Sequence, residues 1–271
     1  MIQFLQNLPL YQQLNAGILL GSAILCLLLY LTGVSIQLVG TLSLPRISRF
    51  PGSGFPNMGD EIFTLLFIAF FATNCLSVLG AEGSSASATE IWTINIIQTI
   101  LYLPFALRYM SLPPAQSAFF SRHLLTVLFA LAIIYAVCIS MSMFGVDKWL
   151  VHITETPMTQ EITDMMKEEG NLASRIALCF SSIIIAPVME EFTFRGFLYN
   201  ILRQRVGIIA AALSSALFFS AIHMSLVQTL PLFIFGLAQC YVYEKTGSLR
   251  FCILLHFLFN SISSICILSS T

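Results

Sequence analysis

Charged residues are scarce in this sequence. Asp, Glu, Lys and Arg make up only 9% of its 271 residues, whereas hydrophobic residues make up 57%. Soluble domains carry about 25% charged residues, so this chain has too few to cover a surface that faces water. The mean hydropathy of +0.88 agrees. An ordinary soluble protein is therefore excluded. The composition predicts an all-α, polytopic transmembrane helix bundle that forms a single membrane domain over residues 1–271.

Features of several other protein classes are missing as well. The net charge is −1, which gives no electrostatic attraction for nucleic acid. The seven cysteines include no CxxC pair and all fall in apolar runs, so we expect buried free thiols. Residues 1–14 contain no Lys or Arg, whereas a signal peptide begins with a basic segment. The apolar run over residues 15–31 is therefore predicted to be a retained span.

Long apolar runs, separated by Pro, Gly and small polar residues, predict the number of spans. A bilayer core requires about 20 mostly apolar residues per helix. Eight spans are predicted, near residues 15–33, 61–80, 91–110, 123–144, 173–197, 208–224, 229–244 and 250–268. The first four make up an N-terminal part over residues 1–145. A polar insertion over 146–172 follows it, with a short extramembrane helix expected near 157–169.

The basic residues orient these spans. Nine of the twelve Lys and Arg residues fall in loops on one side of the predicted bundle. They are Arg46, Arg49, Arg108, Arg122, Arg195, Arg203, Arg205, Lys245 and Arg250. Cytoplasmic loops carry an excess of Lys and Arg, so this side is expected to be cytoplasmic and both termini are expected outside.

Three ionisable residues interrupt the fifth apolar run. The stretch "APVMEEFTFRGFLYN" contains Glu190, Glu191 and Arg195 directly after the uncharged "IALCFSSIII". A charge at the centre of a membrane helix costs about 2.5–3.5 kcal/mol, so such residues face a polar cavity or one another and are functional by default. Glu191 and Arg195 are spaced to pair along one helix. Glu190 points elsewhere and is left without a local partner.

Two histidines and an asparagine in later apolar runs are the candidate partners. An antiparallel hairpin that turns at "RQRVG" brings Glu190 and His223 to the same depth. His256 arrives on a third helix, and Asn260 follows it one turn later on the same side. The link "HMSLVQTLP" between two short spans is expected to be non-helical at membrane depth, which is tolerated where it lines a cavity. The sequence thus predicts a polar site inside the membrane.

Together these residues form three motifs in a fixed order. "EEFTFR" is an EExxxR motif, "FSAIH" an FxxxH motif and "HFLFN" an HxxxN motif. In this order, on membrane helices, they resemble the CPBP family of intramembrane proteases, which includes the type II CaaX prenyl endopeptidase. The resemblance covers residues 173–268, the expected catalytic region, whereas the spans before residue 145 match only in being hydrophobic.

The resemblance implies hydrolysis of a peptide bond within the membrane. By that analogy Glu190 is the general base that activates a water, and His223 helps to hold this water. His256 and Asn260 would stabilise the oxyanion. The expected partners are membrane lipids and a peptide or lipidated protein substrate, and the expected location is a bacterial inner membrane with the site open to the cytoplasm.

The remaining motif residues have supporting roles in this analogy. Arg195, paired with Glu191, would support the site or meet a substrate carboxylate, and Phe219 belongs to the FxxxH motif. No cofactor is favoured, since the chain has no HExxH motif and an asparagine is a poor zinc ligand. A zinc-dependent version stays open, and its ligands would be Glu190, His223 and His256.

Two other classes of function fit the same residues. A proton-coupled transporter also places Glu, His and Arg inside membrane helices, although no inverted repeat is present. A non-catalytic immunity or scaffold protein would bind a peptide without cutting it. The loss of cleavage when Glu190 is replaced, with the protein still inserted, distinguishes the protease from both.

Overall fold

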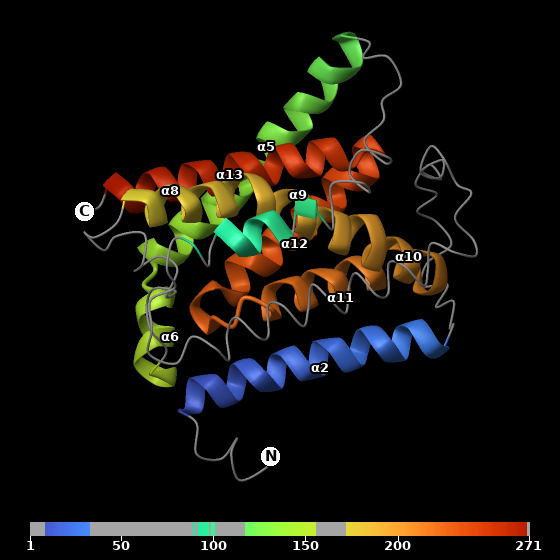
Figure 1. Cartoon of the computed structure of the whole chain (residues 1–271). Coiled ribbons are helices and arrows are strands. Elements are labelled where there is room, and N and C mark those ends of the chain that lie inside the picture. Colours follow the sequence, from blue (N-terminus) through green and yellow to red (C-terminus); the bar gives the residue numbers. More distant parts are fainter. Residues whose placement is uncertain are drawn as a thin grey trace.

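The computed structural model describes residues 9–32, 89, 92–97, 99–100, 117–155 and 172–269. All regular structure in these ranges is helical, which confirms the all-α fold (Figure 1). Five of the described helices are long and apolar enough to cross a membrane. These spans are Leu10–Leu29, His123–Met143, Leu172–Tyr199, Leu226–Thr246 and Leu249–Ser269.

The predicted spans agree with these helices with one correction. The helix α11 (Ile208–Ala221) has 14 residues, so it is about 21 Å long and shorter than the roughly 30 Å hydrocarbon core. The predicted span over 208–224 is therefore not a full crossing. The predicted span 61–80, most of 91–110 and the helix expected near 157–169 lie outside the described residues.

The helices follow one another in a simple order. The chain begins with α2 (Leu10–Thr32), α5 (Ser117–Met143) and α6 (Val146–Thr154). A continuous helical run then contains α8 (Leu172–Phe180), the π-helix η1 (Ser181–Ile185), α9 (Ala186–Glu191), the π-helix η2 (Phe192–Tyr199) and α10 (Asn200–Val206). It is followed by α11, α12 (Leu226–Thr246) and α13 (Leu249–Ser269). The helix α6 occupies the start of the polar insertion, where no helix was predicted.

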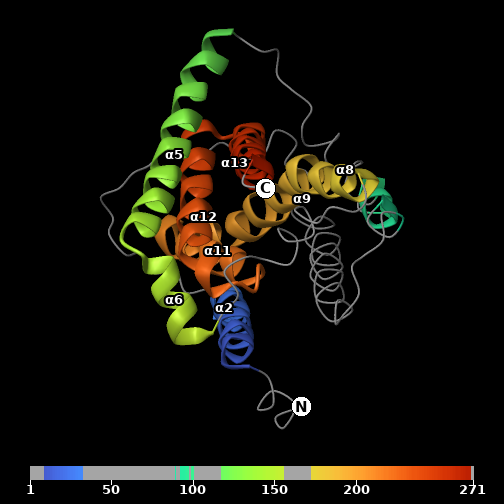
Figure 2. The same cartoon turned by 90° about the vertical axis from the view of Figure 1, so that its left-hand side faces the viewer.

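The helices α11 and α12 lie at the centre of the bundle. On one side α11 packs between α2 and α12, and on the other α13 packs against α5, α12 and the α9 region (Figures 1 and 2). Large apolar side chains remain exposed on the outside of these helices, for example Leu20 at 63%, Leu125 at 69% and Ile265 at 63%. Apolar residues on the outside of long apolar helices are what a lipid environment requires.

The described cysteines are all free thiols, as the sequence predicted. Cys26, Cys240 and Cys252 are buried, which also agrees. Cys138 and Cys179 are only partly buried. The prediction of burial is wrong for Cys266, which is exposed near the end of α13. Cys75 lies outside the described residues.

The predicted hairpin and link are both present, although the link is shorter than expected. Gly207, with φ 82°, turns the chain between α10 and α11. The non-helical link covers only residues 222–225, because α12 already begins at Leu226. Met224 adopts φ 51°, and its carbonyl accepts a 2.7 Å hydrogen bond from the side chain of Asn15 on α2. One carbonyl of the irregular backbone is thus satisfied by a side chain from another helix.

A glycine allows α11 and α12 to approach closely. A Cβ placed on Gly236 would lie 2.8 Å from Cβ and 2.9 Å from Cα of Ala216. Small residues at such crossings let the backbones of membrane helices touch. The missing side chain therefore determines the spacing of the two helices at this point.

We predict that Gly236→Ala destabilises the protein by about 1–3 kcal/mol, because the added methyl group overpacks this crossing. The thermal midpoint of the purified protein in detergent measures the effect. Gly21→Ala on α2 is the matched control, since its Cβ would meet nothing within 4 Å and alanine favours a helix. Equal midpoints for the two variants would contradict the close crossing.

Candidate active site

The two adjacent glutamates lie on a short α-helical stretch between two π-helices. This stretch is α9, which follows η1 and precedes η2. In η1 the amide of Ala186 donates to the carbonyl of Ser181, five residues back. Pro187 comes next and has no amide hydrogen to continue the ladder. Single π-helical turns are frequent at functional sites because they rotate the following side chains relative to a regular helix.

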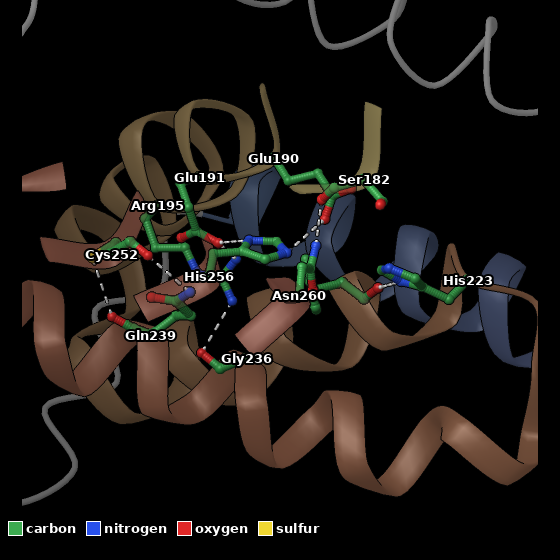
Figure 3. Close-up of polar contacts among 11 residues, drawn as sticks. Ser182, Glu190, Glu191, Arg195, His223, Gly236, Gln239, Cys252, His256 and Asn260 are labelled. Atoms are coloured by element: carbon green, nitrogen blue, oxygen red, sulfur yellow. Dashed lines mark hydrogen bonds and ion pairs between the residues drawn. The ribbon is translucent and has the colours of Figure 1, made fainter. Parts of the chain in front are cut away.

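A fully buried carboxylate joins three helical segments. Oε1 of Glu191 lies 3.0 Å from Nη1 of Arg195 and 2.8 Å from Nδ1 of His256, and the side chains of both Glu191 and Arg195 are completely buried (Figure 3). Nη2 of Arg195 donates to the carbonyl of Gly236 at 3.2 Å. The predicted pair of Glu191 and Arg195 is therefore confirmed, and it extends to α13 and α12.

The opposite edge of the His256 ring, which carries Nε2, points at Glu190. Nε2 of His256 lies 3.8 Å from Oε2 of Glu190, whose side chain is 14% exposed. Because Glu191 holds Nδ1, the ring is fixed with Nε2 toward the second glutamate. The two adjacent glutamates thus contact opposite nitrogens of one imidazole, and Glu190 obtains the partner from another helix that the sequence required.

Aromatic rings enclose this chain of polar groups. Phe194, Phe219 and Phe235 are at most 1% exposed. Cζ of Arg195 lies 4.6 Å from the centre of the Phe219 ring. The Phe235 ring is 4.8 Å from that of His256. Rings on these sides exclude water from the ion pairs and strengthen them, and a desolvated cation–π contact adds about 2 kcal/mol.

His223 and Asn260 lie near this cluster but bind backbone carbonyls. Nδ1 of His223 lies 2.8 Å from the carbonyl of Phe219, and the two rings are 4.9 Å apart. Nδ2 of Asn260 donates to the carbonyl of Ser182 at 2.7 Å. In Figure 3 His223 lies beyond Asn260, away from the Glu191 and Arg195 end of the cluster. The ring of Phe219 lies 6.1 Å from that of His256, so it is close to both histidines.

Several buried polar atoms in the site have no hydrogen-bond partner within the described residues. They are Oε2 of Glu190, Oε2 of Glu191, Nε of Arg195 and Oε1 of Gln239. Gln239 is held by Nε2, which donates to the carbonyl of Cys252 at 3.1 Å. Buried polar atoms are nearly always satisfied in proteins, so these three acceptors and one donor are available to bond water or a polar ligand.

The arrangement does not fit a metal ion. Within the described ranges no three His, Cys, Asp or Glu side chains converge as ligands. Glu190, His223 and His256, the zinc ligands considered from the sequence, do not form such a group.

The structure adds contacts that the sequence did not indicate. Ser182 and Gly236 accept hydrogen bonds through their backbone carbonyl oxygens. Every residue has such an oxygen, so no pattern of side chains predicts which one accepts. Gln239 pairs with Cys252 through a two-way contact, since the thiol lies 3.6 Å from the Gln239 carbonyl. Only Pro187, three residues before Glu190 within an apolar run, was a readable signal of irregular backbone.

The structure also corrects the orientation argument. Arg195 was counted among the loop charges, but it is completely buried in η2 and paired with Glu191. A paired, buried guanidinium does not face the cytoplasm, so the positive-inside argument rests on the other eight basic residues.

The fold and the site together define an integral membrane protein in which a carboxylate, an imidazole and a guanidinium are in contact and buried among the helices. Residues 172–262 match the family model described as Type II CAAX prenyl endopeptidase Rce1-like. This match confirms the resemblance that the three motifs indicated, and it covers every motif residue. No curated protein and no solved structure matches the chain significantly.

We predict that Arg195→Met destabilises the protein by about 3–5 kcal/mol, because it leaves the buried carboxylate of Glu191 without its guanidinium partner. Thermal unfolding in detergent, followed by circular dichroism, measures this. Lys148→Met removes the same kind of charge from an exposed position and is expected to leave the midpoint within about 0.5 kcal/mol of the parent. Equal effects of the two substitutions would show that the buried pair does not stabilise the fold.

Proposed function

We propose that this protein is an intramembrane endopeptidase that hydrolyses a peptide bond in a membrane-associated or lipidated peptide, with water activated by Glu190. The observation that carries the proposal is the buried chain that fixes Nε2 of His256 at 3.8 Å from Oε2 of Glu190. The match to a protease family supports the reaction class.

The proposed reaction uses the open oxygen of Glu190 as a general base. A water between Glu190 and His256 loses a proton to this carboxylate while its oxygen bonds to the scissile carbonyl carbon. Glu190 then passes the proton to the departing amine nitrogen as the carbon–nitrogen bond breaks. The water oxygen thus ends in the new carboxyl group and its proton on the new amine, and no covalent bond forms between enzyme and substrate.

His256 is proposed to stabilise the negative charge that develops on the substrate oxygen. In its protonated form, with Nδ1–H donated to Glu191, the imidazole donates from Nε2 as well. The two carboxylates of Glu190 and Glu191 would then be balanced by Arg195 and His256, which leaves the buried group neutral overall. A donor fixed in a water-poor site is worth about 2.7–4 kcal/mol of barrier.

His223 is proposed to help hold the water, as the resemblance implies. The contact of its Nδ1 with the Phe219 carbonyl orients the ring at the end of α11. The link after it, which Asn15 ties to α2, fixes the end of α11 from which this ring projects.

The proposal also covers the kind of substrate and the orientation of the protein in the membrane. A membrane-bound or lipid-modified peptide reaches a site within the bilayer laterally, and membrane lipids surround it. The eight remaining basic residues favour a site open to the cytoplasm and both termini outside. The bacterial inner membrane is the location we propose.

We predict that Glu190→Gln lowers kcat by about 10²–10⁴, the contribution of a positioned general base, and leaves the protein folded and inserted. The measurement compares new peptide termini in membranes that contain the parent or the variant, together with cleavage of a farnesylated CaaX peptide by the purified proteins. Glu155→Gln, at an exposed position, is the matched control and is expected to retain full activity.

The same comparison distinguishes the other classes of function. Identical sets of termini for the parent and Glu190→Gln would refute the protease. A transporter would instead lose substrate flux, and an immunity or scaffold protein would lose neither.

We also propose that the reaction requires no metal ion, since the candidate ligands do not converge. Activity of the purified enzyme is therefore expected to survive exhaustive dialysis against EDTA and 1,10-phenanthroline, within about twofold of the untreated sample. A loss of activity on chelation that is reversed by zinc would overturn this part of the proposal while the peptidase itself stands.

A further inference from the structure

The bond between Asn260 and Ser182 has a specific cause in the backbone. At the end of η1 the amide of Ala186 donates to the carbonyl of Ser181, five residues back. The next amide in this register would be that of residue 187, donating to Ser182. Residue 187 is proline and has no amide hydrogen. The carbonyl of Ser182 therefore loses its helical donor inside a membrane span, where water does not replace it.

Asn260 supplies the missing donor from another helix. Its Nδ2 lies 2.7 Å from the Ser182 carbonyl oxygen, although the two residues are 78 positions apart. An unsatisfied backbone carbonyl in a bilayer costs several kcal/mol, so this contact joins α13 to η1. We infer that Asn260 is a positioning residue: its amide replaces the hydrogen bond that Pro187 removes and thereby holds α13 in register with the Glu190 helix.

This register matters for the proposed reaction, on which the inference rests. His256 lies one turn before Asn260 on α13, and Ser182 lies two turns before Glu190. Two contacts therefore join the same pair of helices, Ser182 with Asn260 and Glu191 with His256. With both in place, neither helix can slide or rotate relative to the other, and the 3.8 Å separation of Glu190 and His256 is fixed.

The alternative role for Asn260 is direct donation to the substrate oxyanion. Nδ2 carries two hydrogens, so the bond to Ser182 does not by itself prevent a second bond. The two roles predict different responses to a change at residue 187. Pro187→Ala restores an amide hydrogen for the Ser182 carbonyl within its own helix. If Asn260 satisfies that carbonyl, the change offsets the stability that Asn260→Leu loses, although it does not rejoin α13 to η1. If Asn260 serves only the substrate, Asn260→Leu loses no stability that could be offset.

The test is a double-substitution cycle with Pro187→Ala and Asn260→Leu, which removes the donor at similar size. Asn260→Leu is expected to lower kcat by about 100-fold, the effect of a displacement of about 1 Å, with KM changed less than about threefold. It is also expected to lower the thermal midpoint by about 2–10 °C, because the Ser182 carbonyl is left unsatisfied. Adding Pro187→Ala is expected to recover most of the midpoint, because the carbonyl is then satisfied within its own helix, but not kcat, because the contact between α13 and η1 stays broken.

Asn15→Leu is the matched control for the rescue. It removes a carboxamide that also donates to a backbone carbonyl, that of Met224, so it is expected to be destabilising as well. Pro187→Ala is expected to leave the Asn15→Leu protein without recovery, because the restored amide is at a different carbonyl. Recovery of both would mean that Pro187→Ala stabilises the fold in general, and the inference would fall.

Two further outcomes complete the test. A loss of kcat in Asn260→Leu with an unchanged midpoint and no rescue by Pro187→Ala would overturn the inference in favour of an oxyanion donor. If the parent cleaves nothing, the proposed function fails, but the midpoints alone still decide the contact: coupling between positions 187 and 260 supports it, and additivity refutes it.

Discussion

The carboxylate of Glu191 is the interaction on which the arrangement of these helices depends. One of its oxygens contacts the guanidinium of Arg195 and the imidazole of His256, and all three side chains are buried. A buried charge is tolerated in a bilayer only when it is paired and hydrogen-bonded. These contacts therefore require three segments to meet at one point. They are α9 with η2, α12 at Gly236, and α13.

Backbone irregularities near this point serve the same end. The π-helices on either side of α9 change which way successive side chains face, and consecutive glutamates come to contact opposite nitrogens of His256. Each irregularity frees carbonyl oxygens, and asparagine side chains donate to them. Asn200 is a further case: its Nδ2 lies 3.1 Å from the carbonyls of Arg195 and Gly196 at the end of η2. Carboxamides suit this task because they donate without bringing a charge into lipid.

The sequence predicted the parts of this structure that depend on composition and on helical spacing. Scarce charge predicted membrane helices, the four-residue separation of Glu191 and Arg195 predicted their pair, and the turn at Gly207 was readable from its surroundings. The contact of Glu191 with His256 was not predictable, because helical spacing already gave Glu191 a partner in Arg195 and left Glu190 as the carboxylate expected to meet a histidine. The binding partner of Asn260 was not predictable either, because it is a backbone carbonyl oxygen and every residue carries one. The length of α11 was overestimated because Ile222 and His223 continue its apolar pattern past the last helical turn.

The bond between Asn15 and the Met224 carbonyl has a consequence for what counts as one folding unit. Residues 172–262 carry the family signature, yet the peptide that joins α11 to α12 is completed by a helix at the start of the chain. A fragment cut to the matched region would expose that oxygen to acyl chains and free the segment that bears His223. The helix α2 is thus a structural part of the half that matches the family model, and homologues that differ there would need a substitute donor of their own.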